Sequence, residues 1–135
     1  MNQKLYYKKG NYKYQLHSAY KRQTKIRPKK NAYSDFTNLT KEGILLIKPA
    51  YAWNGANSFP DKKWIMRGSC VHDALLQLIG LGKLDPSWKD QVDRELQECC
   101  VEDGAWRWVS WCVYKAVRKF GSPRGMKDTP VKVAP

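Results

Sequence analysis

The sequence predicts one α+β domain, in which a small N-terminal antiparallel β-sheet made of hairpins precedes three packed helices. Three observations support this prediction. The chain has 135 residues, which suits a single domain. Short segments with turn signals between them fill about residues 4–48, and apolar residues at helical spacing occupy about residues 63–120. We assign residues 1–121 to the domain, with an irregular loop over 49–62 and a loose tail over 122–135.

The first half of the chain predicts two hairpins. Strand-like segments lie in pairs around turn signals, namely 5–8 and 12–16 around Lys9-Gly10-Asn11, and 35–39 and 44–47 around Thr40-Lys-Glu-Gly43. The segment Ile44 to Ile47 is apolar enough to be a central strand. The basic segment 21–30 between the hairpins contains Pro28 and paired lysines, which indicates an exposed loop.

Helical spacing begins after the loop. Trp64, Gly68, Val71, Leu75 and Leu78 recur every three or four residues, as in an amphipathic helix that packs on a core. Gly80 and Gly82 are expected to end this helix. Asp85-Pro86 provides an N-cap and a proline at the first helical position, so a second helix is expected to run to about Val101.

A third helix is predicted after Asp103-Gly104. Its apolar stripe consists of Trp106, Val109, Val113, Val117 and Phe120, and Gly121 and Pro123 would stop it. Most of the tryptophans are expected to form core and interhelix contacts; they are Trp64, Trp88, Trp106, Trp108 and Trp111.

The charge is large and uneven. The net charge is +13, and residues 1–34 contain ten Lys and Arg and no acidic residue. This pattern suggests a polyanionic partner, which could be nucleic acid, an anionic lipid surface or an acidic protein; the alternative is a solvated basic face that maintains solubility. The candidate polyanion-binding residues are Lys8, Lys9, Lys13, Lys21, Arg22, Lys25, Arg27, Lys29 and Lys30.

Hydropathy and cysteine content bear on the compartment. The N-terminus lacks the apolar run of a signal peptide and no segment is long enough to span a membrane, so we expect a soluble cytoplasmic protein. The cysteines are expected to be reduced and packed as small hydrophobic residues. A zinc site made of Cys70, His72, Cys99 and Cys100 is the alternative, although these residues lack Cys-x-x-Cys spacing.

The pair His72-Asp73 on the first helix and Asp93 on the second form the main candidate site. Adjacent residues on a helix point about 100° apart. His72 can therefore face the second helix, where Asp93 would orient it as a general base, while Asp73 points elsewhere and can bind a cation. Alternatively, Asp73 caps a loop or accepts from Arg67, and Asp93 forms a structural ion pair with Arg94, Arg107 or Arg118.

The order of several motifs resembles a bacteriophage and prophage family, domain of unknown function 1353. The motifs are Asn54-Gly-Ala-Asn-Ser-Phe-Pro60, His72-Asp-Ala-Leu, Asp93 and Tyr114-Lys-Ala-Val-Arg-Lys-Phe-Gly121, within residues 35–121. This resemblance implies a phage context, in which the protein would lie in the host cytoplasm or in a virion and would contact virion components. It assigns no chemistry.

A second, weaker resemblance is to phospholipase A2, and it rests on the order of a glycine-containing loop, Pro-Asp, Cys, His-Asp and then Asp-Arg. It implies that His72 activates a water, that Asp73 binds calcium together with carbonyls of Asn54 and Gly55, and that Asp93 orients His72. The chain departs from that family at Leu76, where phospholipases have a tyrosine, and in a loop with fewer glycines. In this interpretation Trp53 and Phe59 would contact substrate or membrane, while the Asn54-Gly55 pair by itself is also typical of a simple turn.

Two functions therefore remain open. The first is a calcium-dependent hydrolase of lipids or other esters that docks on anionic membranes. The second is a non-enzymatic virion or accessory protein that binds nucleic acid or an acidic protein through its basic N-terminal half. An inactive phospholipase-like scaffold would belong to the second class.

Overall fold

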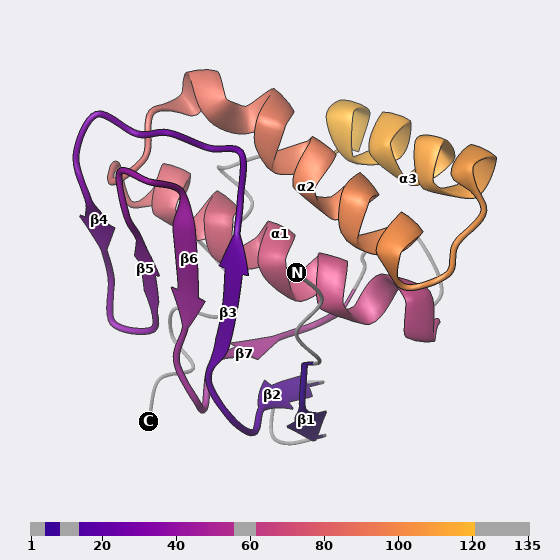
Figure 1. The fold of residues 1–135 in the computed structure, drawn as a ribbon, viewed down its shortest axis with the longest axis horizontal. Helices are drawn as coiled ribbons and strands as arrows, with labels where there is room; N and C mark the ends of the chain where they lie inside the picture. Colours follow the sequence, from indigo (N-terminus) through magenta and orange to yellow (C-terminus); the bar gives the residue numbers. More distant parts are fainter. Residues whose placement is uncertain (1–4, 9–13, 56–61, 121–135) are drawn as a thin grey trace.

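The computed structural model describes residues 5–8, 14–55 and 62–120, and it confirms the α+β class. Antiparallel strands come first, and three helices follow on one side of them (Figure 1). The strands are β1 (Tyr7–Lys8), β2 (Tyr14–Leu16), β3 (Tyr20–Gln23), β4 (Ala32–Tyr33), β5 (Thr37–Leu39), β6 (Ile44–Ile47) and β7 (Ala52–Trp53).

The larger sheet has the strand order β3-β6-β5-β4, so β6 is central, as its apolar sequence predicts. The β5–β6 hairpin is confirmed, with Leu39 opposite Leu45. The prediction of a loop over 21–30 was wrong at its start, because β3 pairs along its whole length with β6, from Tyr20 opposite Ile47 onward. After Tyr20 the residues of β3 are all basic or polar, although they alternate between the two faces of the sheet. The sequence therefore lacks the apolar–polar alternation that indicates a strand.

The smaller sheet has the order β1-β2-β7. Pairing of Tyr7 with Leu16 confirms the first hairpin, whose turn at Lys9-Gly10-Asn11 lies outside the described residues. Strand β7 was expected to be part of an irregular loop. It pairs with β2 through Tyr14 and Trp53, and a two-residue strand is too short to show alternation in sequence.

The helices are α1 (Lys63–Gly80), the short 3₁₀ helix η1 (Pro86–Trp88), α2 (Lys89–Glu102) and α3 (Arg107–Phe120). Asp85 caps η1 by accepting a hydrogen bond from the Ser87 backbone N–H at 2.8 Å, as its position before a proline predicts. Helix α1 lies against the strands, α2 packs along α1, and α3 packs along α2 (Figure 1). The tail over 122–135 lies outside the described residues.

The main core lies between α1 and the strands. The inward-facing leucine and isoleucine side chains of β5, β6 and α1 are buried there, and Trp53 of β7 joins them. A smaller cluster of Ile65, Leu96, Cys100 and Val113 joins the three helices. None of the helices in the described part of the chain is both long enough and apolar enough to cross a membrane.

The expectation that most tryptophans pack inside was wrong for three of them. Trp64 and Trp88 pack against the core clusters, but Trp106, Trp108 and Trp111 are exposed. The stripe that the sequence predicts for α3 is correct at Val113, which is fully buried. Trp106 precedes the first helical residue, Arg107.

Gly68 sets the distance between α1 and α2. A Cβ at this position would lie 2.7 Å from Leu96 Cδ1, 3.1 Å from the Leu96 carbonyl oxygen and 3.2 Å from Cys99 Cβ. These contacts are closer than normal van der Waals packing, so only glycine allows the observed approach. His72 lies one turn further along α1, and its ring contacts Asp93 of α2 where the two helices lie close together.

We therefore expect Gly68→Ala to lower the free energy of unfolding by about 1 kcal/mol. Overpacking costs ~1–3 kcal/mol, and the better helix propensity of alanine returns about 1 kcal/mol. Urea unfolding would measure the difference. If Gly68→Ala stabilised the protein, as propensity alone predicts, the close contact between α1 and α2 would be refuted.

Candidate functional site

His72 and Asp93 are in direct contact. Nε2 of His72 lies 2.6 Å from Oδ1 of Asp93. His72 is 5% exposed and Asp93 is fully buried. The contact forms because α1 and α2 run side by side, with each residue on the flank of its apolar stripe. The structure thus brings together the two residues that the sequence singled out as base and orienter.

The second oxygen of Asp93 binds two cations. Lys89 Nζ lies 2.6 Å from Oδ2, and Nη1 of Arg118 lies 3.1 Å from the same atom. Asp93 consequently links α1, α2 and α3. Arg118 was one of the alternative partners that the sequence left open, whereas Lys89 was missed, although it lies four residues before Asp93 on the same helix.

The surroundings set the protonation states of the pair. Burial lowers the pKa of His72 below its ordinary value; Asp93 opposes this effect and Lys89 adds to it. Burial opposes ionisation of Asp93, but the hydrogen bonds from His72 and Lys89 hold the pKa of that carboxyl below its usual value. The pair is therefore a neutral imidazole beside a carboxylate at neutral pH. This is the state that a general base needs.

The other ring nitrogen of His72, Nδ1, has no hydrogen-bond partner among the described residues. With Nε2–H donating to Asp93, Nδ1 carries the lone pair, which is the tautomer that the Asp93 contact favours. A water at Nδ1 could lose a proton to it.

Asp73 lies next to His72 but points in another direction. Burial raises the pKa of Asp73 to about 8, and within the described ranges no hydrogen bond or ion pair reaches its carboxyl group. The expected alternative partner, Arg67, instead binds Glu102 and Asp103. Burial is the main cause that raises the pKa of the Tyr51 phenol, and the charge of the nearby Asp73 raises this pKa further.

The Tyr51 hydroxyl is buried and has no hydrogen-bond partner among the described residues. Carboxylate and hydroxyl oxygens are the kinds of ligand that a hard cation such as Ca²⁺ prefers. Gly55 has φ +82° and turns the backbone just after Trp53. Binding of calcium by Asp73 and by carbonyls of Asn54 and Gly55 stays a prediction.

Side chains alone do not make a metal cluster here. No group of three or more His, Cys, Asp or Glu placed to hold a metal ion occurs in the described ranges. Cys70, Cys99 and Cys100 are buried free thiols, and burial raises the pKa of Cys99 and of Cys100 to about 12. A calcium site at Asp73 would thus depend on backbone carbonyls, as in the phospholipase-like interpretation.

The raised pKa of Asp73 predicts a pH-dependent stability. An unfolded aspartate has a pKa near 3.8, so between about pH 4 and pH 8 the folded chain holds a proton that the unfolded chain has lost, and stability falls as pH rises. Since one pKa unit corresponds to about 1.4 kcal/mol, we expect Asp73→Asn to be ~1 kcal/mol or more stabilising at pH 9 in the presence of a chelator. The gain should be smaller at pH 5.

Urea unfolding at pH 5, 7 and 9 would measure this dependence. Asp35→Asn, at an exposed aspartate, is the matched control and should show no comparable trend. An equal effect of Asp73→Asn at all three pH values would contradict the raised pKa of Asp73.

Trp53 does not lie on the surface, contrary to the expectation that it contacts substrate or membrane. It is fully buried in β7, and its Nε1–H donates to Ser69 Oγ at 3.0 Å. It stacks on Tyr51 with ring centroids 6.4 Å apart. Its role is to hold the start of the loop against α1. Phe59, the other expected contact residue, lies outside the described residues.

The candidate polyanion-binding residues differ in their exposure to solvent. Lys21, Lys25, Arg27, Lys29 and Lys30 are exposed. Lys8 lies in β1, and Lys9 and Lys13 lie outside the described residues.

Arg22 was wrongly placed among the polyanion-binding residues. It is buried, with Nε 3.0 Å from Oε1 of Glu95 and Nη1 3.0 Å from Oε1 of Glu102. Alternation along β3 turns Arg22 toward the helices, where two carboxylates neutralise it.

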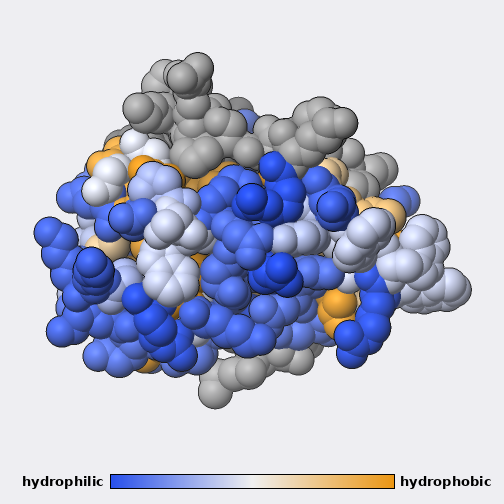
Figure 2. Space-filling view, turned by 90° about the horizontal axis from the view of Figure 1, so that it is seen from above, coloured by the Kyte–Doolittle hydropathy of each residue, from blue (hydrophilic) through white to orange (hydrophobic). Residues whose placement is uncertain are grey.

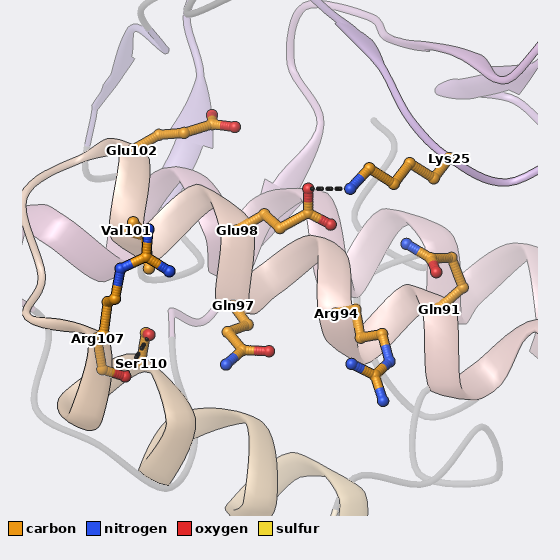
Figure 3. Close-up of a pocket in the computed structure, with 9 residues that line it drawn as sticks. All are labelled: Lys25, Gln91, Arg94, Gln97, Glu98, Val101, Glu102, Arg107 and Ser110. Carbon is orange, nitrogen blue, oxygen red and sulfur yellow. Dashed lines mark hydrogen bonds and ion pairs between the residues drawn. The ribbon is translucent and has the colours of Figure 1, made fainter.

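A groove of about 510 Å³ with a mostly polar lining lies along α2, away from the His72–Asp93 contact (Figure 3). Figure 3 shows Gln97 and Arg94 on α2 pointing toward α3, while Lys25 reaches Glu98 from the opposite side. The residues that line the groove are Lys25, Gln91, Arg94, Gln97, Glu98, Val101, Glu102, Arg107 and Ser110. Because the groove mixes both charges and does not include His72 or Asp93, it adds no chemistry to the His–Asp pair.

Comparison with protein families, with curated proteins and with solved structures finds no match to this chain.

Proposed function

We propose that this chain is a bacteriophage-type hydrolase of lipid esters, similar in mechanism to phospholipase A2. The observation that carries the proposal is the 2.6 Å contact between His72 Nε2 and Asp93 Oδ1 in a buried position. A buried, neutral imidazole oriented by a carboxylate is the arrangement that activates a nucleophile. The resemblance in motif order gives the lipid ester as substrate class.

In this mechanism Nδ1 of His72 removes a proton from a water while the water oxygen attacks the ester carbonyl carbon. Asp93 holds the ring in the required tautomer and stabilises the imidazolium that forms. When the tetrahedral intermediate collapses, the imidazolium gives its proton to the leaving alkoxide, so that an alcohol and a fatty acid are released. Lys89 and Arg118 keep Asp93 ionised, but their charges also oppose the imidazolium and so moderate the basicity of His72.

Calcium would be held by Asp73 and by backbone carbonyls of Asn54 and Gly55, where it would polarise the ester carbonyl and stabilise the oxyanion. The Asp73 carboxyl group and the Tyr51 hydroxyl, neither of which has a hydrogen-bond partner among the described residues, support this assignment. A bound cation would favour the ionised form of Asp73.

Calorimetry with calcium alone tests the site, using the full chain, Asp73→Asn and the control Asp35→Asn. We expect binding to the wild type and to the control, and none to Asp73→Asn. In parallel, release of fatty acid from phosphatidylglycerol vesicles should require calcium and should be lost in Asp73→Asn. The absence of fatty acid release under any calcium concentration would overturn the proposal.

A second candidate function is binding of a polyanion without catalysis. The observation in its favour is the set of exposed basic residues before and within the connection from β3 to β4, which includes Lys25, Arg27, Lys29 and Lys30. Binding to nucleic acid through these residues should weaken steeply with salt and should be unchanged in a variant that lacks the His72 imidazole. Gel-shift titrations at two salt concentrations would separate the two functions.

A further inference from the structure

Three large aromatic side chains project from the N-terminal end of α3 into solvent. Trp106, Trp108 and Trp111 are 71%, 63% and 55% exposed. Figure 2 looks onto the side of α2 and α3 and shows a largely hydrophilic surface with pale side chains of intermediate hydropathy at its right-hand end. We call Trp106, Trp108, Trp111 and Lys115 the tryptophan face.

The tryptophan face is not needed to hold α3 in place. The opposite side of the helix packs on α2, with Ser110 and Val113 buried. Tyr114 donates a hydrogen bond to Asp90, and Arg118 binds Asp93 at 3.1 Å. Several largely exposed indoles on one surface are costly in water, and such a surface is typical of a binding site for a partner.

Contacts within the tryptophan face favour a lipid surface over nucleic acid. The rings of Trp106 and Trp108 meet edge to face, with centroids 6.3 Å apart and planes at 75°, and Lys115 Nζ lies 5.7 Å from the centre of the Trp111 ring. Stacking of bases would need free, flat ring faces. Indoles beside ammonium groups on one side of a helix instead suit the headgroup region of a bilayer, where the ring is buried and its N–H stays hydrated.

The charge of the helix favours anionic lipids in particular. Residues 107–120 contain four basic residues and no acidic residue, within a chain of net charge +13. Arg118 is paired with Asp90 and Asp93, whereas Arg107 and Lys115 lie close to the tryptophans in sequence. Basic residues close to a membrane surface are attracted to anionic headgroups over about a Debye length. The tryptophan face is therefore complementary in both polarity and charge to a membrane that contains anionic lipids.

We propose that the tryptophan face of α3 is the surface that docks this protein on anionic lipid bilayers. The choice of a lipid partner rests on the proposed function. Docking through α3 would place the bilayer on the same helix whose Arg118 contacts Asp93, so that lipid is bound next to the elements that carry the His–Asp pair.

Co-sedimentation with vesicles of phosphatidylcholine, with and without phosphatidylglycerol, tests this surface. The double variant Trp108→Ser/Trp111→Ser removes two indoles that the core does not use, and its unfolding midpoint should match that of the wild type. Tyr33→Ser is the matched control, since Tyr33 is an exposed aromatic residue on β4, away from α3. We expect the double variant to bind phosphatidylglycerol vesicles at least about tenfold more weakly and the control to bind normally.

Equal binding by the wild type and the double variant, or no binding of the wild type to either vesicle, would overturn the proposal. Capture of nucleic acid or protein by the tryptophan face without vesicle binding would also overturn it. The test is independent of catalysis. Tryptophan-dependent vesicle binding without fatty acid release would refute the hydrolase and would leave the docking surface in place.

Discussion

Replacing His72 by glutamine is expected to lower the rate of lipid ester hydrolysis by about 10²–10⁴-fold, the usual contribution of a general base. The amide nitrogen of glutamine can replace Nε2 as a donor to Asp93, but glutamine has no basic nitrogen in place of Nδ1. The fold should survive, because Lys89 and Arg118 still neutralise Asp93. Initial rates of fatty acid release and far-ultraviolet circular dichroism would measure the two effects separately.

His17→Gln is the matched control for this substitution. His17 is the only other histidine of the chain and is exposed, so its replacement should leave the rate unchanged. A His72→Gln protein that is folded and fully active would show that the His–Asp contact is architectural. In that case the second candidate function, polyanion binding, would become the main one.

Replacing Glu95 by alanine is expected to have the largest effect on stability, a loss of ~3 kcal/mol, because it removes the fully buried one of the two carboxylates that neutralise Arg22. Glu102 still contacts Arg22, which places the loss at the lower end of the range for breaking a buried ion pair. Glu95 is 1% exposed. Its Oε1 accepts from Arg22 Nε at 3.0 Å, and its Oε2 accepts from the backbone N–H of Lys25 at 2.9 Å. These bonds join β3 to α2 across the interface between sheet and helices.

Urea unfolding of Glu95→Ala beside Glu98→Ala would test this expectation. Glu98 lies one turn later on α2 and pairs with Lys25 at the surface, at 3.1 Å. An exposed pair of this kind contributes about 0–1 kcal/mol. Similar losses in the two variants would contradict the structural role of the buried pair. Replacing both Arg22 and Glu95 by apolar residues of similar size should recover much of the loss, since no unpaired charge then remains.

Local sequence patterns predicted the elements well where they were long. The bounds of α1 and α2 follow from glycines, a capping aspartate and apolar spacing, all of which act within a few residues. The short strand β7 and the basic strand β3 were missed, because pairing with β2 and β6 stabilises them and their own sequences do not show it.

The contact between His72 and Asp93 was predictable for a related reason. Both residues flank apolar stripes on consecutive helices, and consecutive helices joined by a short connection usually pack side by side. The second oxygen of Asp93 was harder to predict, because Arg118 reaches it from α3. Which of several arginines does so depends on how α3 lies on α2.

By itself, the sequence determined the α+β class, the order of its helices and hairpins and the meeting of His72 with Asp93, because periodicity and turn chemistry are properties of neighbouring residues. Only the tertiary structure decided that Arg22 is buried with Glu95, that Trp53 is in the core and that Trp108 and Trp111 remain in solvent. The physical reason is that burial is a property of the whole packing. A side chain of a given type is buried or exposed according to which distant segments lie over it, and its charge or aromatic character alone does not specify those segments.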